Sequence, residues 1–239
     1  MPAVTRKRRK QAAAPVPLLL RRLQKNYPNA KLALDFTTPV ELLVALILAA
    51  QCTDKKVNEV TATLFCKYRS AADYAAADSA VLEADIRQTG FFRQKARSVQ
   101  TCCRQLIERF GGEVPSRLDD LLQLTGVGRK TANILLGNAF GIPGIGVDTH
   151  VLRLSQRLGL TRNTDPDKVE ADLTAVVPRK SQIKFCYLIQ HHGRVTCFAR
   201  QPACPTCFLA DICPYPHKTK PAPPAKRRPA FGRRPGPLA

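Results

Sequence analysis

The chain has 239 residues, of which 44% are hydrophobic, and this size suffices for one sizeable core or two small ones. Its formal net charge of +20 and pI of about 10.0 indicate an acidic partner, and the commonest acidic polymer is nucleic acid. The longest apolar run, residues 40–50, is interrupted by Glu41 and is far too short to span a membrane, and no signal peptide is visible. These features argue against a membrane protein and favour a nucleic-acid-binding one.

Both ends of the chain are strongly basic. Residues 1–25 contain eight Lys and Arg residues and residues 214–239 contain seven, with no acidic residue in either stretch, so the rest carries only +5 of the net charge. We predict a disordered basic arm over 1–16 and a disordered basic tail over 216–239, whose prolines cannot hold a helix and which has nothing to pack. Both are expected to bind phosphates, the alternative being that they only keep the protein soluble.

Helix start and stop signals follow the arm. Thr38-Pro39-Val40-Glu41 is a capping box with proline at the first helical position, and it opens an apolar helix that runs to Ala50. Asp78 is expected to cap a helix that stops at Gly90, and a helix over 95–110 should end at Gly111-Gly112.

The same signals continue towards the C-terminus. Ser116 is expected to cap a helix over 118–122, and Asp165-Pro166 opens a helix over 167–177 that Pro178 closes. No stretch alternates apolar and polar residues in the way of a strand, so the predicted fold class is all-α.

Two glycines separate the short helix before them from a new helix near Arg129. Gly126 and Gly128 are expected to adopt backbone angles that other residues avoid and to let a ligand approach the amides at the new helix start. This helix–hairpin–helix pattern is typical of DNA phosphate binding, and the alternative is a helix connection without a ligand.

Lys130 lies in the first turn of that new helix. An ordinary lysine has a pKa of about 10.4, so only roughly one in 2,500 is neutral at pH 7. The helix start, the adjacent Arg129 and desolvation in a cleft would all lower the pKa and make the amine a nucleophile. The alternative is an exposed lysine that binds phosphate.

Asp148 precedes the apolar helical pattern over 151–158 and is predicted to be its N-cap. A carboxylate held ionised by helix amides could also stabilise positive charge that develops on a deoxyribose. We expect the nearby His150 to pack or to form hydrogen bonds rather than to catalyse.

Four cysteines close the ordered part of the chain: Cys197, Cys204, Cys207 and Cys213 have six, two and five residues between them. Such spacing predicts a metal centre, either zinc or a [4Fe–4S] cluster, and composition alone does not separate the two. The other five cysteines fall in helical patterns and are expected to be buried, small apolar residues.

Taken together, these motifs resemble the endonuclease III family. The four-cysteine run, Gly126-Val127-Gly128-Arg129-Lys130-Thr131-Ala132-Asn133 and Val147-Asp148-Thr149-His150 carry the resemblance, which covers residues 17–215 and extends to Ala50–Asp54 and His192–Arg194. It implies two helical domains flanking a DNA-binding cleft: a six-helix barrel over 38–148 that holds the hairpin, and a domain built from 17–37 and 149–215. It also implies that the second domain binds a [4Fe–4S] cluster through the four cysteines.

The resemblance implies a bifunctional DNA glycosylase and AP lyase of base excision repair. Lys130 would attack the sugar C1′, expel an oxidised pyrimidine and form a Schiff base, after which β-elimination cuts the strand 3′ to the abasic site. Asp148 would assist this chemistry, Gln51 would fill the hole that the flipped nucleotide leaves, and Phe91 would wedge into the duplex. Double-stranded DNA with damaged pyrimidines or abasic sites would be contacted further by Gly126, Gly128, Arg129, Arg194 and Arg200.

The implied protein is a monomer in the bacterial cytoplasm, at the nucleoid, or in the nucleus if the source is eukaryotic. Two departures from the family pattern stand out: Thr125 replaces the usual proline before the hairpin, and Arg200 is the only cation in 198–203. Two alternatives remain open. One is a related adenine- or mismatch-specific glycosylase, which would use a carboxylate in the helix before Gln51, and the other is a non-catalytic DNA-binding iron–sulfur protein.

Overall fold

A computed structural model describes residues 12–220, so most of the predicted arm and nearly all of the predicted tail lie outside the described residues. Within 12–220 the chain forms helices and no strand, which confirms the all-α fold class. No helix within this described range is both long and apolar enough to cross a membrane. The α-helices run in the order α1 (Val16–Asn26), α2 (Pro39–Leu48), α3 (Asp54–Lys67), α4 (Ala71–Ala76), α5 (Ser79–Asp85), α6 (Phe92–Phe110), α7 (Leu118–Leu121), α8 (Arg129–Ala139), α9 (Thr149–Arg157), α10 (Pro166–Val176) and α11 (Gln182–Val195). Three short 3-10 helices complete the fold: η1 (Arg87–Thr89), η2 (Arg179–Ser181) and η3 (Cys204–Thr206).

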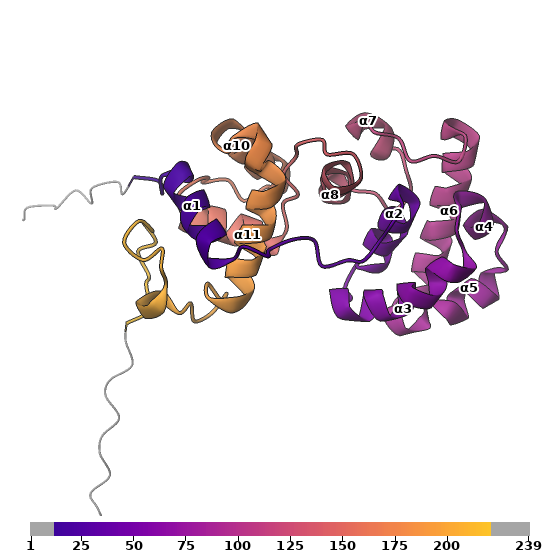
Figure 1. The fold of residues 1–239 in the computed structure, drawn as a ribbon, viewed down its shortest axis with the longest axis horizontal. Helices are drawn as coiled ribbons and strands as arrows, with labels where there is room; N and C mark the ends of the chain where they lie inside the picture. Colours follow the sequence, from indigo (N-terminus) through magenta and orange to yellow (C-terminus); the bar gives the residue numbers. More distant parts are fainter. Residues whose placement is uncertain (1–11, 221–239) are drawn as a thin grey trace, which may run out of the picture.

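The buried side chains form two separate hydrophobic clusters, which define two lobes. The first cluster draws on residues between Leu34 and Leu136, and the second on Ala14–Ala30 together with residues from Ile145 to Leu209. The segment between α1 and α2 therefore crosses from the second lobe to the first, and α8 lies beside the junction (Figure 1). The N-terminal helix thus belongs with the C-terminal helices, and α1 packs on α11.

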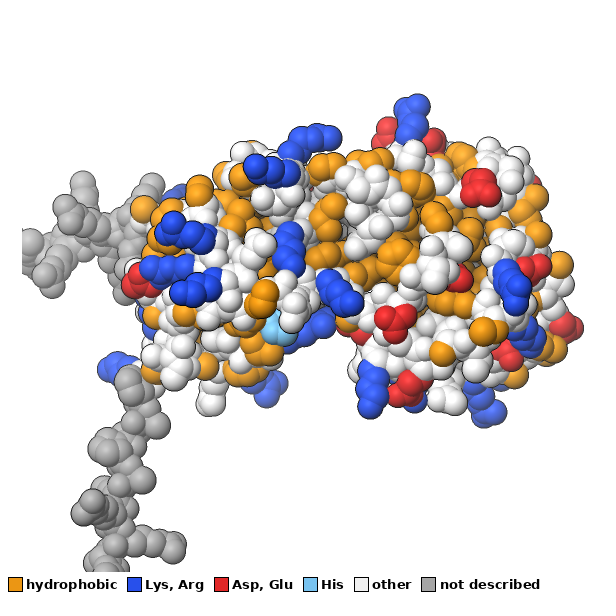
Figure 2. Space-filling model, in the orientation of Figure 1, with side chains coloured by type: hydrophobic (Ala, Val, Ile, Leu, Met, Phe, Trp, Pro, Cys, Tyr) orange, Lys and Arg blue, Asp and Glu red, His pale blue; other side chains and the backbone are white. Residues whose placement is uncertain are grey.

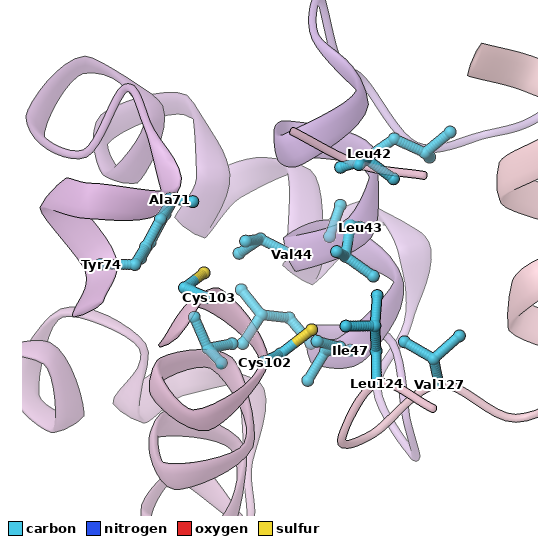
Figure 3. Close-up of a cluster of buried hydrophobic side chains, with 14 of the residues drawn as sticks. Leu42, Leu43, Val44, Ile47, Ala71, Tyr74, Cys102, Cys103, Leu124 and Val127 are labelled. Carbon is cyan, nitrogen blue, oxygen red and sulfur yellow. The ribbon is translucent and has the colours of Figure 1, made fainter. Parts of the chain in front are cut away.

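The first lobe is packed around α2, which is apolar on almost every side. Leu42, Leu43, Val44 and Ile47 of this helix meet the adjacent Cys102 and Cys103 of α6 and the hairpin residues Leu124 and Val127 (Figure 3). A helix buried all round must have its polar ends satisfied locally. The predicted capping box does so, because Thr38 Oγ1 accepts from the Glu41 amide at 3.2 Å and the Glu41 carboxylate accepts from the Thr38 amide.

Most other predicted helix boundaries hold to within a few residues. Asp78 and Asp165 each cap their helices by accepting a hydrogen bond from the amide three residues on. The segment from Asp78 to Gly90 does not stay α-helical, since α5 ends at Asp85 and η1 follows. The Ser116 prediction is wrong: α7 starts after Arg117, and Ser116 lies one residue too early to reach its free amides.

Candidate active site

A cleft of about 610 Å³ opens where the two lobes meet, and both lobes supply its walls. Lys130 of α8 and Asp54 of α3 line it from the first lobe, and Asp148 and Arg194 line it from the second. The space-filling view shows a notch between the lobes (Figure 2). Basic side chains are frequent on the side of α1 and α11, whereas acidic and basic side chains alternate on the other lobe (Figure 2). The cleft therefore brings together the two residues predicted to be catalytic.

Lys130 is the second residue of α8, and the helix start positions it. Gly128 is the N-cap and makes no side-chain cap bond, so the first amides of α8 have no capping side chain. Lys130 is exposed, which corrects the expectation that the cleft buries its amine. The hairpin needs a left-handed residue only at Gly126, whose φ is +83°. Gly128 is extended, with φ −93° and ψ 174°, which corrects the expectation that both glycines adopt unusual angles.

Asp148 faces the same cleft because the segment before it packs tightly on α8. A Cβ on Gly146 would lie 3.0 Å from the Ile134 side chain and 3.3 Å from the Lys130 carbonyl, so only glycine allows this approach without adjustment. The buried Asn133 amide donates to the Ile145 carbonyl at 3.2 Å and fixes the segment further. Sequence reasoning gave no individual role to Asn133 or Gly146, although Asn133 ends the hairpin motif and Gly146 directly precedes the Asp148 motif.

The Asp148 carboxylate caps α9, as predicted. Its Oδ1 accepts a hydrogen bond from the Val151 amide at 2.7 Å, which fixes the carboxylate at the helix start. His150, in the first turn of α9, contacts the Arg153 guanidinium at 3.1 Å, and desolvation lowers the pKa of its imidazole. This places His150 in a packed hydrogen-bond network, in line with the expectation for it.

Ion pairs join the lobes on both sides of the cleft. Arg129 of α8 binds Glu170 of α10 through two bonds of 2.9 and 3.0 Å, and Arg194 of α11 lies 3.2 Å from Asp54 of α3. The bond to Glu170 raises the pKa of Arg129. Two of the three arginines predicted to bind DNA, Arg129 and Arg194, are therefore paired with carboxylates in this structure, and a DNA contact by Arg129 would compete with Glu170.

A second hollow, of about 270 Å³, adjoins the cleft at the turn after α2. Gln51 and Phe91 line it together with Gly126 and Lys95. Gln51 (φ 52°) and Phe91 (φ 48°) are the only non-glycine residues of 12–220 with positive φ, and Phe91 is 61% exposed. Each such residue costs about 1–3 kcal/mol and persists only where the surroundings enforce it, which is typical of functional sites. The two residues predicted to enter the base stack are thus the two with strained backbones.

The four C-terminal cysteines line a small cavity of their own, of about 30 Å³, beside α9 and α11. The Arg157 guanidinium donates to the Cys197 thiol at 3.2 Å, and His192 Nε2 lies 3.6 Å from the Cys207 thiol. No group of three or more metal-binding side chains within residues 12–220 converges closely enough for one ion. The exposed Arg200 lies in the same loop.

The remaining cysteines match their predicted role in part. Cys102, Cys103 and Cys186 are buried, and burial raises the pKa of each of these thiols to about 12. Cys52 is half-buried at the cleft and Cys66 is exposed, so these two are not core residues.

Comparison with known proteins decides the family. Residues 44–179 match the HhH-GPD superfamily base excision DNA repair protein. The chain is 51% identical over 207 residues to Endonuclease III of Synechocystis, covering 86% of this chain and 93% of the relative, and 38% identical over 200 residues to Endonuclease III of Escherichia coli, covering 84% and 95%. The solved structure of a trapped Endonuclease III–DNA covalent intermediate aligns with a TM-score of 0.79 at 43% identity, covering 84% of this chain and 94% of that one. The chain belongs to the endonuclease III family.

Members of this family are DNA glycosylases and AP lyases of base excision repair, and this chain is such a bifunctional enzyme. The resemblance inferred from the motifs is confirmed. The adenine- or mismatch-specific alternative would need a carboxylate late in α2, but the only acid of that helix is Glu41, which is occupied in the capping box.

The departure from the endonuclease III pattern at Thr125 is compensated within the fold. Proline has no amide hydrogen, whereas the Thr125 amide donates to Gln105 Oε1 of α6 at 2.7 Å. This bond ties the hairpin to α6, so the turn that precedes α8 has a tether in place of the stiffness of a proline.

Proposed function

We propose that this enzyme excises oxidised pyrimidines from double-stranded DNA through a Schiff base on Lys130 and then cuts the strand 3′ to the abasic site. The observation that carries the proposal is that Lys130, from the first lobe, and Asp148, from the second, line one cleft. Because Lys130 is exposed there, its amine is accessible to a nucleotide that has left the base stack.

The chemistry needs a nucleophile and a fixed negative charge. The neutral Lys130 amine attacks C1′ of the flipped nucleotide, and the bond to the damaged base breaks as positive charge develops on the sugar. The Asp148 carboxylate stabilises that charge, since its bond to the Val151 amide fixes it in place. The displaced base takes up a proton and leaves, the C1′–O4′ bond of the sugar ring then opens with a proton going to O4′, and the amine and C1′ are left joined as a Schiff base. Loss of a C2′ proton from this Schiff base expels the 3′ phosphate by β-elimination.

In this proposal both lobes contact the duplex. Gln51 fills the hole left in the duplex and Phe91 enters the base stack from the neighbouring hollow. The amides at the start of α8, next to Gly126 and Gly128, bind a backbone phosphate, and Arg194 and Arg200 add contacts on the second lobe. Arg129 would contact DNA only by leaving Glu170, because its guanidinium already donates two hydrogen bonds to the Glu170 carboxylate.

Cys197, Cys204, Cys207 and Cys213 would hold a [4Fe–4S] cluster. The fit rests on their donor chemistry: four thiols line one cavity without converging on a single point, and a cluster takes one thiolate at each of its irons. A single zinc ion would need all four sulfurs around one centre. The cluster would organise the loop from Cys197 to Cys213, and no step of the base excision passes through it.

A trapping assay tests the proposal. The protein is incubated with a duplex containing thymine glycol in the presence of borohydride, which reduces a Schiff base to a stable covalent link. We expect wild type to be trapped and Lys130→Ala to bind the duplex without being trapped or cutting it. Trapping that survives in Lys130→Ala, or a wild type that removes the base without ever being trapped, would overturn the assignment.

A further inference from the structure

Lys95, in the first turns of α6, is a buried cation without a carboxylate partner. It is only 5% exposed, and no ion pair within residues 12–220 includes it. Its Nζ donates instead to two backbone carbonyls, that of Leu48 at 2.8 Å and that of Thr89 at 2.7 Å. Burial lowers the pKa of Lys95, so the position is costly for a charge and requires an explanation.

Both carbonyls belong to the last residue of a helix. Leu48 ends α2, and the Cys52 amide one turn further on donates to Ala49 instead. Thr89 ends η1, and the Gly90 amide donates to Arg87. Carbonyls at helix ends lack an intrahelical partner and carry partial negative charge. One ammonium therefore caps two helix C-termini that are 41 positions apart in the sequence.

The two residues with positive φ, Gln51 and Phe91, come shortly after these two carbonyls in the chain. Gln51 comes three positions after Leu48, and Phe91 two positions after Thr89. Both have positive φ and both line the hollow that Lys95 also lines. A left-handed Gln or Phe returns to a relaxed conformation unless the chain around it is held. Lys95 donates a hydrogen bond to the carbonyl just before each turn, and it thereby links the two turns to each other.

We propose that Lys95 is the positioning residue for duplex reading: it cross-links the Gln51 turn to the Phe91 turn, so that both residues enter a base stack as one rigid unit. The inference rests on the proposed roles of Gln51 and Phe91 and adds a third residue that contacts no DNA itself. Preorganisation of this kind removes the cost of ordering two loops when the duplex binds.

The test compares substrates that do and do not need the two turns. An abasic site in a single strand has no opposing base and no hole to fill, so its cleavage depends on the Lys130 chemistry alone. Lys95→Met keeps the aliphatic stem but removes both hydrogen bonds. We expect its cutting of a thymine-glycol duplex to fall by at least about tenfold, equivalent to about 1.4 kcal/mol, while cleavage of the single-stranded abasic site stays at the wild-type rate. Lys180→Met, which removes one exposed charge from the second lobe, should leave both rates unchanged.

A mutant cycle then asks whether Lys95 acts through the two turns. Adding Lys95→Met to the Gln51→Ala, Phe91→Ala double variant should cause no further loss on the duplex. If Lys95→Met does not fold, Lys95→Arg takes its place, because a planar guanidinium cannot reproduce the two bonds of the ammonium and should give the same duplex-specific loss. Equal losses on both substrates, no loss on the duplex, or an additive loss in the cycle would overturn the inference. Failure of the proposed function is distinguishable, since it would appear as wild-type protein that never forms a borohydride-trapped adduct.

Discussion

The two lobes use the same residue type in opposite ways. In the first lobe, Cys102 and Cys103 are core residues packed against α2, and burial raises the pKa of both thiols to about 12 (Figure 3). In the second lobe, four half-buried cysteines line a cavity in a loop whose one regular element is the single turn η3. The core of the first lobe is filled mainly by helical side chains, whereas the C-terminal loop of the second lobe adds one buried side chain, Leu209, to its core. A cysteine that is buried between helices therefore contributes to core packing, whereas a half-buried cysteine that lines a cavity is a candidate metal ligand.

The largest expected effect follows from that difference. Cys207→Ser should abolish bound iron and make the loop from 197 to 213 more sensitive to proteolysis, because the cluster would add four ligand bonds to a loop otherwise held by Leu209 in the core and by hydrogen bonds from Arg22 and Arg157. Iron content and limited proteolysis measure this. Cys66→Ser, an exposed thiol of the first lobe, is the matched control and should change neither; equal iron in both variants would contradict the cluster assignment.

The next effect is on the apolar core of the first lobe. Leu106 is fully buried in α6, so Leu106→Ala should lower the free energy of unfolding by about 2–5 kcal/mol. Its neighbour Ile107 is 42% exposed, and Ile107→Ala should cost less than about 0.5 kcal/mol. Urea denaturation measures both, with iron content unchanged in each. Similar losses of unfolding free energy in the two variants would show that the stability of this lobe does not depend on its buried apolar core.

A smaller effect distinguishes the helix-capping role of Asp148 from its proposed catalytic role. Asp148 and Asp165 cap α9 and α10 with the same type of bond, at 2.7 and 3.0 Å. Replacing either with Ala should cost about 1 kcal/mol of stability. Only Asp148→Ala should also slow base excision, by about 10²-fold, because only Asp148 lines the cleft. If Asp165→Ala slows excision as much, the loss comes from the helix rather than from the carboxylate.

The smallest effect is a difference in thiol reactivity. A thiol with a pKa of about 12 is almost wholly protonated at pH 8, and only the thiolate reacts with iodoacetamide. Cys102 and Cys103 should stay unlabelled in the folded protein, while the exposed Cys66 is labelled. Peptide mass spectrometry reads this out, and labelling of Cys102 or Cys103 without urea would show that the first lobe opens readily.

Features that depend on neighbouring residues could be predicted from the sequence. The caps at Thr38, Asp148 and Asp165 are local bonds over three positions, so the spacing reveals them. Ser116 failed by one residue, because a short helix such as α7 offers no periodicity to fix its start.

Features that depend on packing could not be predicted. The pairing of Arg129 with Glu170 spans 41 positions, and the Lys95 bond to Leu48 spans 47, so no local pattern marks either. Nothing in the sequence distinguishes the buried Lys95 from the exposed basic side chains beside it, Arg93 and Arg97. The motifs of the site were therefore visible, while the contacts that hold those motifs in place required the fold.

The central claim is that the Lys130 amine forms the covalent bond to DNA. The most direct measurement reduces the trapped complex with borohydride, digests it, and locates the modified residue by mass spectrometry. We expect the sugar remnant on Lys130 and on no other amine. A remnant on Lys95, on a lysine of the basic termini or on the N-terminal amine would contradict the account.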